Sequence, residues 1–419
     1  MGGASWSCGI GYTGIVPTGG ACDSLPPTQG RELNSRRIGL LVDKELDPLS
    51  ENQDAFGAGS GSASQTQTQT QAQAQTQAHA PQHAAGSVGG GVKGGNAVST
   101  LTQTLAADMQ AVDACLLERM QSDVALIPQL AGYLIAAGGK RIRPLLSLAS
   151  ARLCDVTGSG HVSFAAAVEL IHTATLLHDD VVDESDMRRG QATANRVWSN
   201  QASVLVGDFL YSQSFQLMVE EERLACLRIL AKASAVIAAG EVLQLSIQND
   251  LSAGEAAYMK VIEDKTAELF AAACEVGASV AGANEQAQEA LRLFGLNLGI
   301  AFQLVDDALD YHADQAKLGK TVGDDFAEGK ITLPVLLAYG AGDADQQAFW
   351  RRTIEQREQA EGDLAQAQAF IAQHDAIAIT LAKAQEFADQ AKAQLDGFAN
   401  RELAGQMCDV VDFAVSRGH

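Results

Sequence analysis

Residues 170–183 have the sequence LIHTATLLHDDVVD, an apolar run that passes directly into three carboxylates. Asp179 and Asp183 are four positions apart, so a helix would place them on one face, one turn from each other. Like charges at this spacing cost roughly a few tenths of a kcal/mol on an exposed helix, and more where water is excluded. The segment therefore predicts a largely buried helix whose acidic end needs a cationic partner.

A second acidic motif, FQLVDDALD at 302–310, repeats the same DDxxD spacing with Asp306 and Asp310. One such motif could be an ordinary solvated helix face. Two of them, each preceded by a long apolar stretch, favour a metal site. Mg²⁺ takes one or two carboxylates from a protein and completes its shell with water and substrate phosphate oxygens. Two opposed DDxxD helices would therefore hold Mg²⁺ ions bridged by a diphosphate.

Basic residues accompany both acidic motifs. GGKRIRP at 138–144 is a glycine turn followed by clustered cations, and Arg188-Arg189-Gly190 follows the first acidic motif. Arg offers phosphate oxygens a planar fork and Lys offers a point charge. Either patch alone could be a surface salt-bridge partner, but their nearness to the acidic motifs favours diphosphate binding.

The composition predicts an all-α fold. Among 419 residues, 47% are apolar and only 5% aromatic, which suits an aliphatic helical core. From Ser99, which we expect to be a helix N-cap, apolar residues recur every three or four positions as far as Met120. Helices then follow to the C-terminus, with glycine breaks near 138–139, 158–160 and 319–323. We expect one helical domain over residues 98–419.

Residues 1–97 differ in composition from the rest of the chain. They are rich in Gly, Ser, Thr and Gln, and include the tract QTQTQTQAQAQTQA at 65–78. Neither face of a strand formed here would bury large side chains, so little apolar burial would offset the conformational entropy lost on ordering this leader. We expect a disordered leader; a self-associating or partner-binding Gln-rich tract and a start codon assigned too far upstream stay open as alternatives.

The net charge and the cysteines indicate which binding partners and which cellular compartment to expect. A net charge of −22 argues against nucleic acid, because phosphate-tracking proteins cluster Lys and Arg. Seven dispersed cysteines without a CxxC pair suit a reducing compartment. The sequence shows no apolar run of the length needed to span a bilayer, and Asp43 interrupts the apolar stretch after Arg36-Arg37. We expect a cytoplasmic protein, peripheral to the membrane at most.

From about residue 100 to its end, the chain resembles the trans-polyprenyl diphosphate synthase family, and most of all its long-chain octaprenyl and decaprenyl members. The motifs that carry the resemblance are GGKRIRP at 138–144, LIHTATLLHDDVVDESDMRRG at 170–190, Lys265-Thr266, FQLVDDALDY at 302–311 and GKTVGDDFAEGKITLP at 319–334. The resemblance implies an isoprenoid synthase-type helical bundle around a central cavity, assembled as a homodimer or larger homo-oligomer.

The resemblance also implies roles for individual residues. The isopentenyl diphosphate contacts would be Lys140, Arg143, His172 and Arg189. The allylic diphosphate contacts would be Arg188, Lys265, Thr266 and Gln303, with Lys320 as a further candidate. Asp179 and Asp183 would bind two Mg²⁺ ions and Asp306 with Asp310 a third, while Asp180 and Asp307 would support these ligands. Catalysis would depend on Asp179, Asp183, Asp306 and Lys265.

The implied reaction is the repeated condensation of isopentenyl diphosphate with an allylic diphosphate. In this family, aromatic residues four or five positions before the first Asp of the motif close the pocket, and here those positions hold Thr175 and Ala174. We therefore expect a long all-trans product, of about eight to ten isoprene units, for a quinone side chain. At about 0.8 kcal/mol per buried CH₂ such a product would leave slowly, so transient membrane contact should speed its release.

Other functions stay open at this point. A shorter-chain farnesyl or geranylgeranyl diphosphate synthase would share the motifs. A terpene cyclase would share the first DDxxD, but the second DDxxD and GGKRIRP count against an enzyme with one diphosphate substrate. A non-catalytic partner subunit usually lacks several acidic residues, whereas this chain keeps all six in the two motifs. A purely structural helical protein would need no carboxylates clustered within apolar helices.

Overall fold

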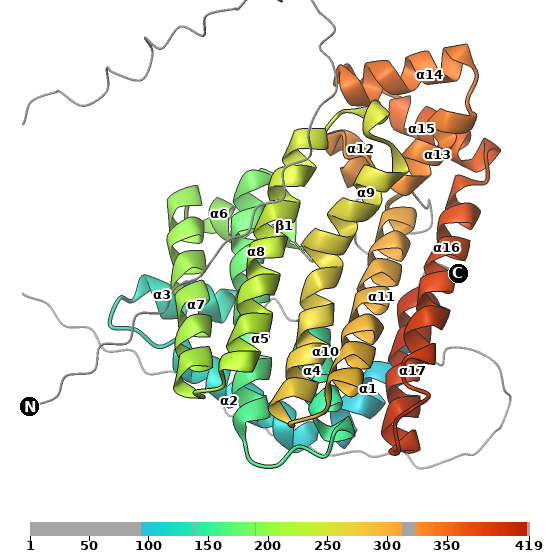
Figure 1. Cartoon of the computed structure of the whole chain (residues 1–419). Helices are drawn as coiled ribbons and strands as arrows, with labels where there is room; N and C mark the ends of the chain where they lie inside the picture. Colours follow the sequence, from blue (N-terminus) through green and yellow to red (C-terminus); the bar gives the residue numbers. More distant parts are fainter. Residues whose placement is uncertain (1–93, 137–138, 189, 312–322, 417–419) are drawn as a thin grey trace, which may run out of the picture. The chain divides into compact units, whose positions relative to one another are not determined.

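The computed structural model of the chain describes residues 94–136, 139–188, 190–311 and 323–416. Within these ranges the fold is helical, as the sequence predicts, and the longest helices run side by side along the molecule (Figure 1). The first half contains α1 (Gly94–Thr104), α2 (Ala106–Arg119), α3 (Leu126–Ala136), α4 (Ile142–Leu153), α5 (Gly160–Val182), α6 (Ala194–Val197), α7 (Asn200–Glu220) and α8 (Leu224–Ile247).

The second half completes the bundle. It contains the 3₁₀ turn η1 (Leu251–Ala253), α9 (Gly254–Ile262), the π-helical segment η2 (Glu263–Ala267), α10 (Glu268–Val280), α11 (Glu285–Asp310), α12 (Asp324–Glu328), α13 (Leu333–Ala341), α14 (Ala344–Trp350), the π-helical segment η4 (Arg351–Glu355), α15 (Asp363–Gln373), α16 (Ala376–Ala393) and α17 (Arg401–Ser416). A short antiparallel hairpin, β1 (Met187–Arg188) with β2 (Gln191–Ala192), interrupts the helices after α5. Gly190, with φ of +76°, lies at its turn.

Helix α5, which carries the first acidic motif, lies in the centre of the bundle. It packs against α2, α4, α7 and α10, and its side chains at Phe164, Leu170 and Ile171 are fully buried. By length and hydropathy α5 could cross a membrane, but 56% of its most apolar window is buried inside the protein. The apolar run before Asp179 is therefore accounted for by core packing.

Two glycines position the π-helical segment η2. A Cβ on Gly240 of α8 would lie 2.9 Å from the backbone nitrogen of Lys265, and a Cβ on Gly299 of α11 would lie 2.5 Å from Cα of Ala267. Both helices therefore approach the backbone of η2 at distances that a larger residue would prevent. This close packing fixes the position of the η2 backbone between α8 and α11, and with it the position of Lys265 and Thr266.

A smaller core supports the segment after the second acidic motif. Trp350 is fully buried and Phe326 is nearly so, with ring centroids 6.5 Å apart in an edge arrangement. Because Phe326 belongs to α12, this cluster anchors α12 beside the end of α11.

Two details of the expected helices were wrong. Ser99 is not an N-cap, because α1 begins at Gly94 and Ser99 lies inside it. The apolar stripe that begins at Leu101 is buried as predicted, but the helix is divided at Leu105, between α1 and α2. The side-chain pattern continues across this division, so periodicity alone could not reveal it.

Candidate active site

Both acidic motifs lie at the C-terminal ends of their helices. Asp183 is the C-cap of α5, and its backbone nitrogen donates to the carbonyl of Asp179 at 2.8 Å, so the two residues share one helical turn as predicted. Asp306 and Asp310 occupy the last turn of α11. The C-terminal end of a helix carries partial negative charge, which adds to that of the carboxylates. The two helix ends therefore favour bound cations.

One aspartate of each motif, Asp183 and Asp307, lines a cavity of about 300 Å³, whereas Asp179, Asp306 and Asp310 are not among its lining residues. Asp183 lines it from the end of α5, while Gln303 and Asp307 line it from α11. Lys265 and Thr266 contribute from η2. The segment after α11 adds Asp325, Glu328 and Lys330, and α9 adds Tyr258, Val261 and Ile262. Acidic and basic side chains that lie far apart in the sequence thus meet at one polar cavity.

In each motif one carboxylate has a raised pKa, because its surroundings disfavour the ionised form. Burial raises the pKa of Asp179 to about 7; Lys265 opposes this shift, and the negative charges of Glu241 and Asp183 add to it. Burial and the charge of Asp325 raise the pKa of Asp310 to about 7. Because desolvation and like charges both disfavour ionisation, these groups fit a site that a cation completes.

Lys265 and Thr266 extend from the π-helical segment η2, a type of helix that occurs often at functional sites. Nζ of Lys265 lies 2.8 Å from Oε2 of Glu241 on α8. The hydroxyl of Thr266 donates to Oε1 of Gln303 at 3.0 Å, and Nε2 of Gln303 donates to Asp307 at 2.7 Å. The structure therefore brings together the predicted allylic diphosphate contacts Lys265, Thr266 and Gln303.

The second carboxylate of each motif is held by protein donors. Asp180 is 2% exposed and accepts from Nε of Arg188 at 2.8 Å. Asp307 is 5% exposed and accepts from the Tyr258 hydroxyl at 2.5 Å as well as from Gln303. Burial and the charge of Asp307 keep the pKa of Tyr258 well above its ordinary range, so this hydroxyl is a donor. Both carboxylates are thus held by hydrogen bonds from other side chains, and their expected supporting role stays a prediction.

Two of the predicted isopentenyl diphosphate contacts, Arg143 of α4 and His172 of α5, lie next to each other. Nη1 of Arg143 is 3.1 Å from Nε2 of His172, and its guanidinium lies 4.2 Å from the centre of the Phe270 ring. Burial lowers the pKa of Arg143 to about 10, so it stays charged at neutral pH, and its Nε has no hydrogen-bond partner within the described ranges. Lys140 is exposed, with Nζ 4.1 Å from the centre of the Phe413 ring of α17. Arg143 and His172 are thus brought together, whereas Lys140 lies against another helix.

Several residues that line the cavity, or that contact a residue lining it, received no role from the sequence. Asp325 and Lys330 belong to the quoted motif at 319–334, and their ionic groups lie 3.5 Å apart. Asp325 also donates its backbone N–H to Asp310 at 3.2 Å, which links it to the second acidic motif. That motif could have identified both residues. Glu241 and Tyr258 stand in no motif that the sequence singled out, so only the fold reveals them.

The predicted chain-length residues lie along α5. Ala174 is fully buried, and the hydroxyl of Thr175 donates to the carbonyl of His172 at 2.9 Å. Neither residue lines the cavity described above. Both lie within the preceding helical turn and a half, toward the core from Asp179.

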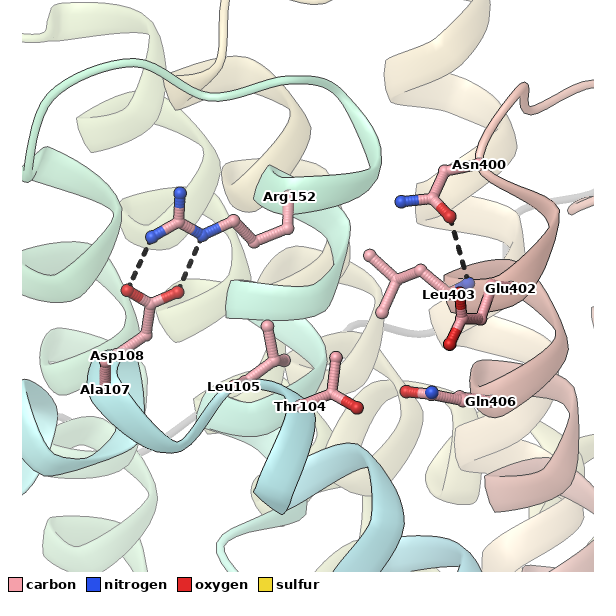
Figure 2. A pocket seen from close by; sticks show the side chains of 9 residues that line it. All are labelled: Thr104, Leu105, Ala107, Asp108, Arg152, Asn400, Glu402, Leu403 and Gln406. Atoms are coloured by element: carbon pink, nitrogen blue, oxygen red, sulfur yellow. Dashed lines mark hydrogen bonds and ion pairs between the residues drawn. The ribbon is translucent and has the colours of Figure 1, made fainter.

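A second cavity of about 380 Å³ lies away from this chemistry (Figure 2). Residues of the α1–α2 junction, the end of α4 and the start of α17 line it, and no predicted site residue is among them. Its one guanidinium, Arg152, is paired in bidentate fashion with Asp108 at 2.7 Å. The smaller cavity, where acidic and basic side chains of α5, η2, α11 and the segment after α11 meet, is therefore the better candidate for the active site.

Two predicted residues, Arg189 and Lys320, lie outside the described residues. Within the described ranges, no three His, Cys, Asp or Glu side chains form a ready-made metal cage. Asp179, Asp183, Asp306, Asp310 and Asp325 are the carboxylates that could hold a cation here, one or two to an ion.

Comparison with known proteins identifies the family. The family model described as polyprenyl synthetase matches residues 124–371, which include both acidic motifs. The chain belongs to this family. It is 47% identical to the octaprenyl diphosphate synthase of Haemophilus influenzae, over 74% of this chain and 94% of that protein. It is 51% identical to the octaprenyl diphosphate synthase of Escherichia coli, over 61% of this chain and 79% of that protein.

Solved structures agree with this assignment. The decaprenyl diphosphate synthase of Rhodobacter capsulatus superposes with a TM-score of 0.75 at 49% identity, covering 77% of this chain and 99% of that one. A polyprenyl synthase from Caulobacter crescentus, complexed with calcium and isoprenyl diphosphate, superposes with a TM-score of 0.74 at 52% identity. The match covers 77% of this chain and 98% of that one. The chain is therefore a prenyltransferase with the all-α isoprenoid synthase fold, as the sequence resemblance implied.

Proposed function

We propose that this polyprenyl synthetase condenses isopentenyl diphosphate repeatedly with an allylic diphosphate to make an all-trans product of about C40 to C50, for a quinone side chain. The observation that carries the proposal is the meeting of Asp183, Lys265 and Gln303 at one cavity, which residues of both acidic helices line. The small side chain of Ala174, one and a half turns toward the core, supports a long product.

The donor set fits Mg²⁺. The carboxylates are hard oxygen ligands, and those of Asp179 and Asp310 are too desolvated to ionise fully near neutral pH without a cation. We propose that Asp179 and Asp183 hold two ions and that Asp306 with Asp310 holds a third. Bound Mg²⁺ would supply Lewis-acid stabilisation of the departing diphosphate.

The side chains of this chain would then act on two diphosphates. Lys265 and the Gln303 amide hold the allylic diphosphate, so that its C–O bond breaks and the electron pair leaves with the diphosphate. Arg143 and His172 hold isopentenyl diphosphate, whose double bond forms the new C–C bond at the allylic carbon. A proton then leaves for the departed diphosphate, which restores an alkene five carbons longer. Arg188 and Lys140 are further candidates for these diphosphate contacts.

Product analysis tests the proposed function. The purified full-length chain is incubated with Mg²⁺, radiolabelled isopentenyl diphosphate and each of the C10, C15 and C20 allylic primers, and the products are sized. We expect a dominant product of about C40 to C50. A dominant C15 or C20 product would show a short-chain synthase, and a cyclic hydrocarbon a terpene cyclase. No turnover with any primer would favour a partner subunit.

The metal proposal predicts a pH-dependent effect of Mg²⁺ on stability. Asp179 and Asp310 have a pKa of about 7 in the folded chain and an ordinary value of 3.8, so the folded state binds more protons between these values. The free energy of unfolding of the metal-free protein should therefore fall as pH rises from about 4 to about 7. Mg²⁺ competes with these protons, so it should raise Tm more at about pH 8 than at about pH 6. Calorimetry measures this, and an equal effect at both pH values would contradict it.

We also propose that the chain forms a homodimer through α7 and α8. Large apolar side chains on these helices are exposed, among them Leu205 at 67%, Val219 at 60% and Val242 at 66%. A second copy would remove this surface from water. Light scattering on the full-length chain would reveal a monomer if this is wrong. We further propose a cytoplasmic location, with transient membrane contact as the long product leaves.

A further inference from the structure

Tyr258 of α9 lies at the wall of the candidate active site but belongs to no motif of the sequence. It is 2% exposed, and its hydroxyl donates to Oδ2 of Asp307 at 2.5 Å. Oδ1 of the same carboxylate accepts from Gln303. Asp307 is therefore held from two sides, by α9 and by its own helix α11.

This arrangement fixes the direction of a chain of hydrogen bonds. Nε2 of Gln303 donates to Oδ1 of Asp307 at 2.7 Å, which leaves the carbonyl oxygen of Gln303 turned away from Asp307. That oxygen accepts from the Thr266 hydroxyl at 3.0 Å, so the proton of Thr266 is committed to Gln303. In this chain of Tyr258, Asp307, Gln303 and Thr266, the second N–H of Gln303 is the donor that these four side chains do not use among themselves. Gln303 lines the cavity.

We propose that Tyr258 is a positioning residue for the allylic diphosphate: through Asp307 it orients the Gln303 amide so that one N–H faces the substrate. This inference rests on the proposed function. Without the hydroxyl, Oδ2 of Asp307 loses its buried donor, and the carboxylate can rotate to recruit the donor that Gln303 keeps for substrate. A phenylalanine preserves the ring and its packing, so only this hydrogen bond is removed.

Steady-state kinetics of the full-length chain with Mg²⁺ test the inference. For Tyr258→Phe we expect KM for the allylic diphosphate to rise about tenfold, the scale of one hydrogen bond to a charged group, with KM for isopentenyl diphosphate unchanged. Calorimetry with an unreactive allylic thiodiphosphate should show the same loss of affinity without turnover. Tyr339→Phe is the matched control, because Tyr339 of α13 contacts Arg351 of η4 and does not line the cavity. An unchanged allylic affinity in a folded Tyr258→Phe protein overturns the inference.

A double-mutant cycle separates positioning from a merely structural role. If Tyr258 acts through Gln303, the losses in Tyr258→Phe and Gln303→Leu should be less than additive in the double variant. Full additivity would overturn the proposal. Should Tyr258→Phe fail to fold, Gln303→Leu carries the test, because it removes the amide and leaves the Tyr258–Asp307 bond in place. Failure of the proposed function is distinct, since the unchanged chain itself would then make no long-chain product with any primer.

Discussion

Replacing Asp179 with asparagine is expected to lower turnover by on the order of a thousandfold, the scale at which removing one electrostatic stabiliser of a transition state acts. Asparagine has the shape of aspartate but no charge, so the variant loses a metal ligand without losing packing. Single-turnover rates with Mg²⁺ and an allylic primer measure the effect. Asp389→Asn is the matched control, because Asp389 is an exposed carboxylate of α16 paired with Lys392.

The same substitution should not destabilise the metal-free fold. Burial and neighbouring negative charges raise the pKa of Asp179 to about 7, so its ionised form is unfavourable in the folded chain. A neutral amide removes this penalty, and at about pH 8 the variant should unfold at a Tm no lower than that of the unchanged chain. Loss of activity together with retained stability would separate a functional carboxylate from a structural one. A fully active Asp179→Asn protein would contradict the metal assignment.

The sequence predicts this part of the site because the signal is local. Asp179 and Asp183 stand four positions apart after an apolar run, and helical geometry alone places them on one face. The same holds for Asp306 and Asp310 in α11. What periodicity could not predict is that each pair lies at a helix C-terminus, where the helix dipole increases the demand for a cation.

Contacts between segments that lie far apart in the sequence could not be predicted from it. Glu241 pairs with Lys265 only because Gly240 lets α8 approach the backbone of η2. The π-helical geometry of η2 has no period that a hydrophobic pattern would show. Tyr258 likewise reaches Asp307 across 49 residues of sequence. Such residues have no sequence signal of their own, because their roles arise from tertiary packing.

Replacing Ala174 with phenylalanine is expected to shorten the product by several isoprene units. Ala174 lies five residues before Asp179 on α5, so it lies about 7.5 Å toward the core from the acidic motif. It is fully buried, and a growing hydrocarbon chain that passes this helix would meet the added ring. The sequence resemblance implies that an aromatic side chain at this position would close the pocket.

A graded series distinguishes a blocked path from a damaged core. Overpacking a well-packed site costs about 1–3 kcal/mol, so a phenylalanine at Ala174 should lower Tm as well as product length. Ala388→Phe adds the same ring at a fully buried alanine of α16, and it should lower Tm without changing product length. Across Ala174→Val, Ala174→Leu and Ala174→Phe, product length measured by mass spectrometry should fall as side-chain volume rises. If folded Ala174→Phe protein still makes the product of the unchanged chain, then the hydrocarbon does not pass Ala174, and another face of α5 borders its path.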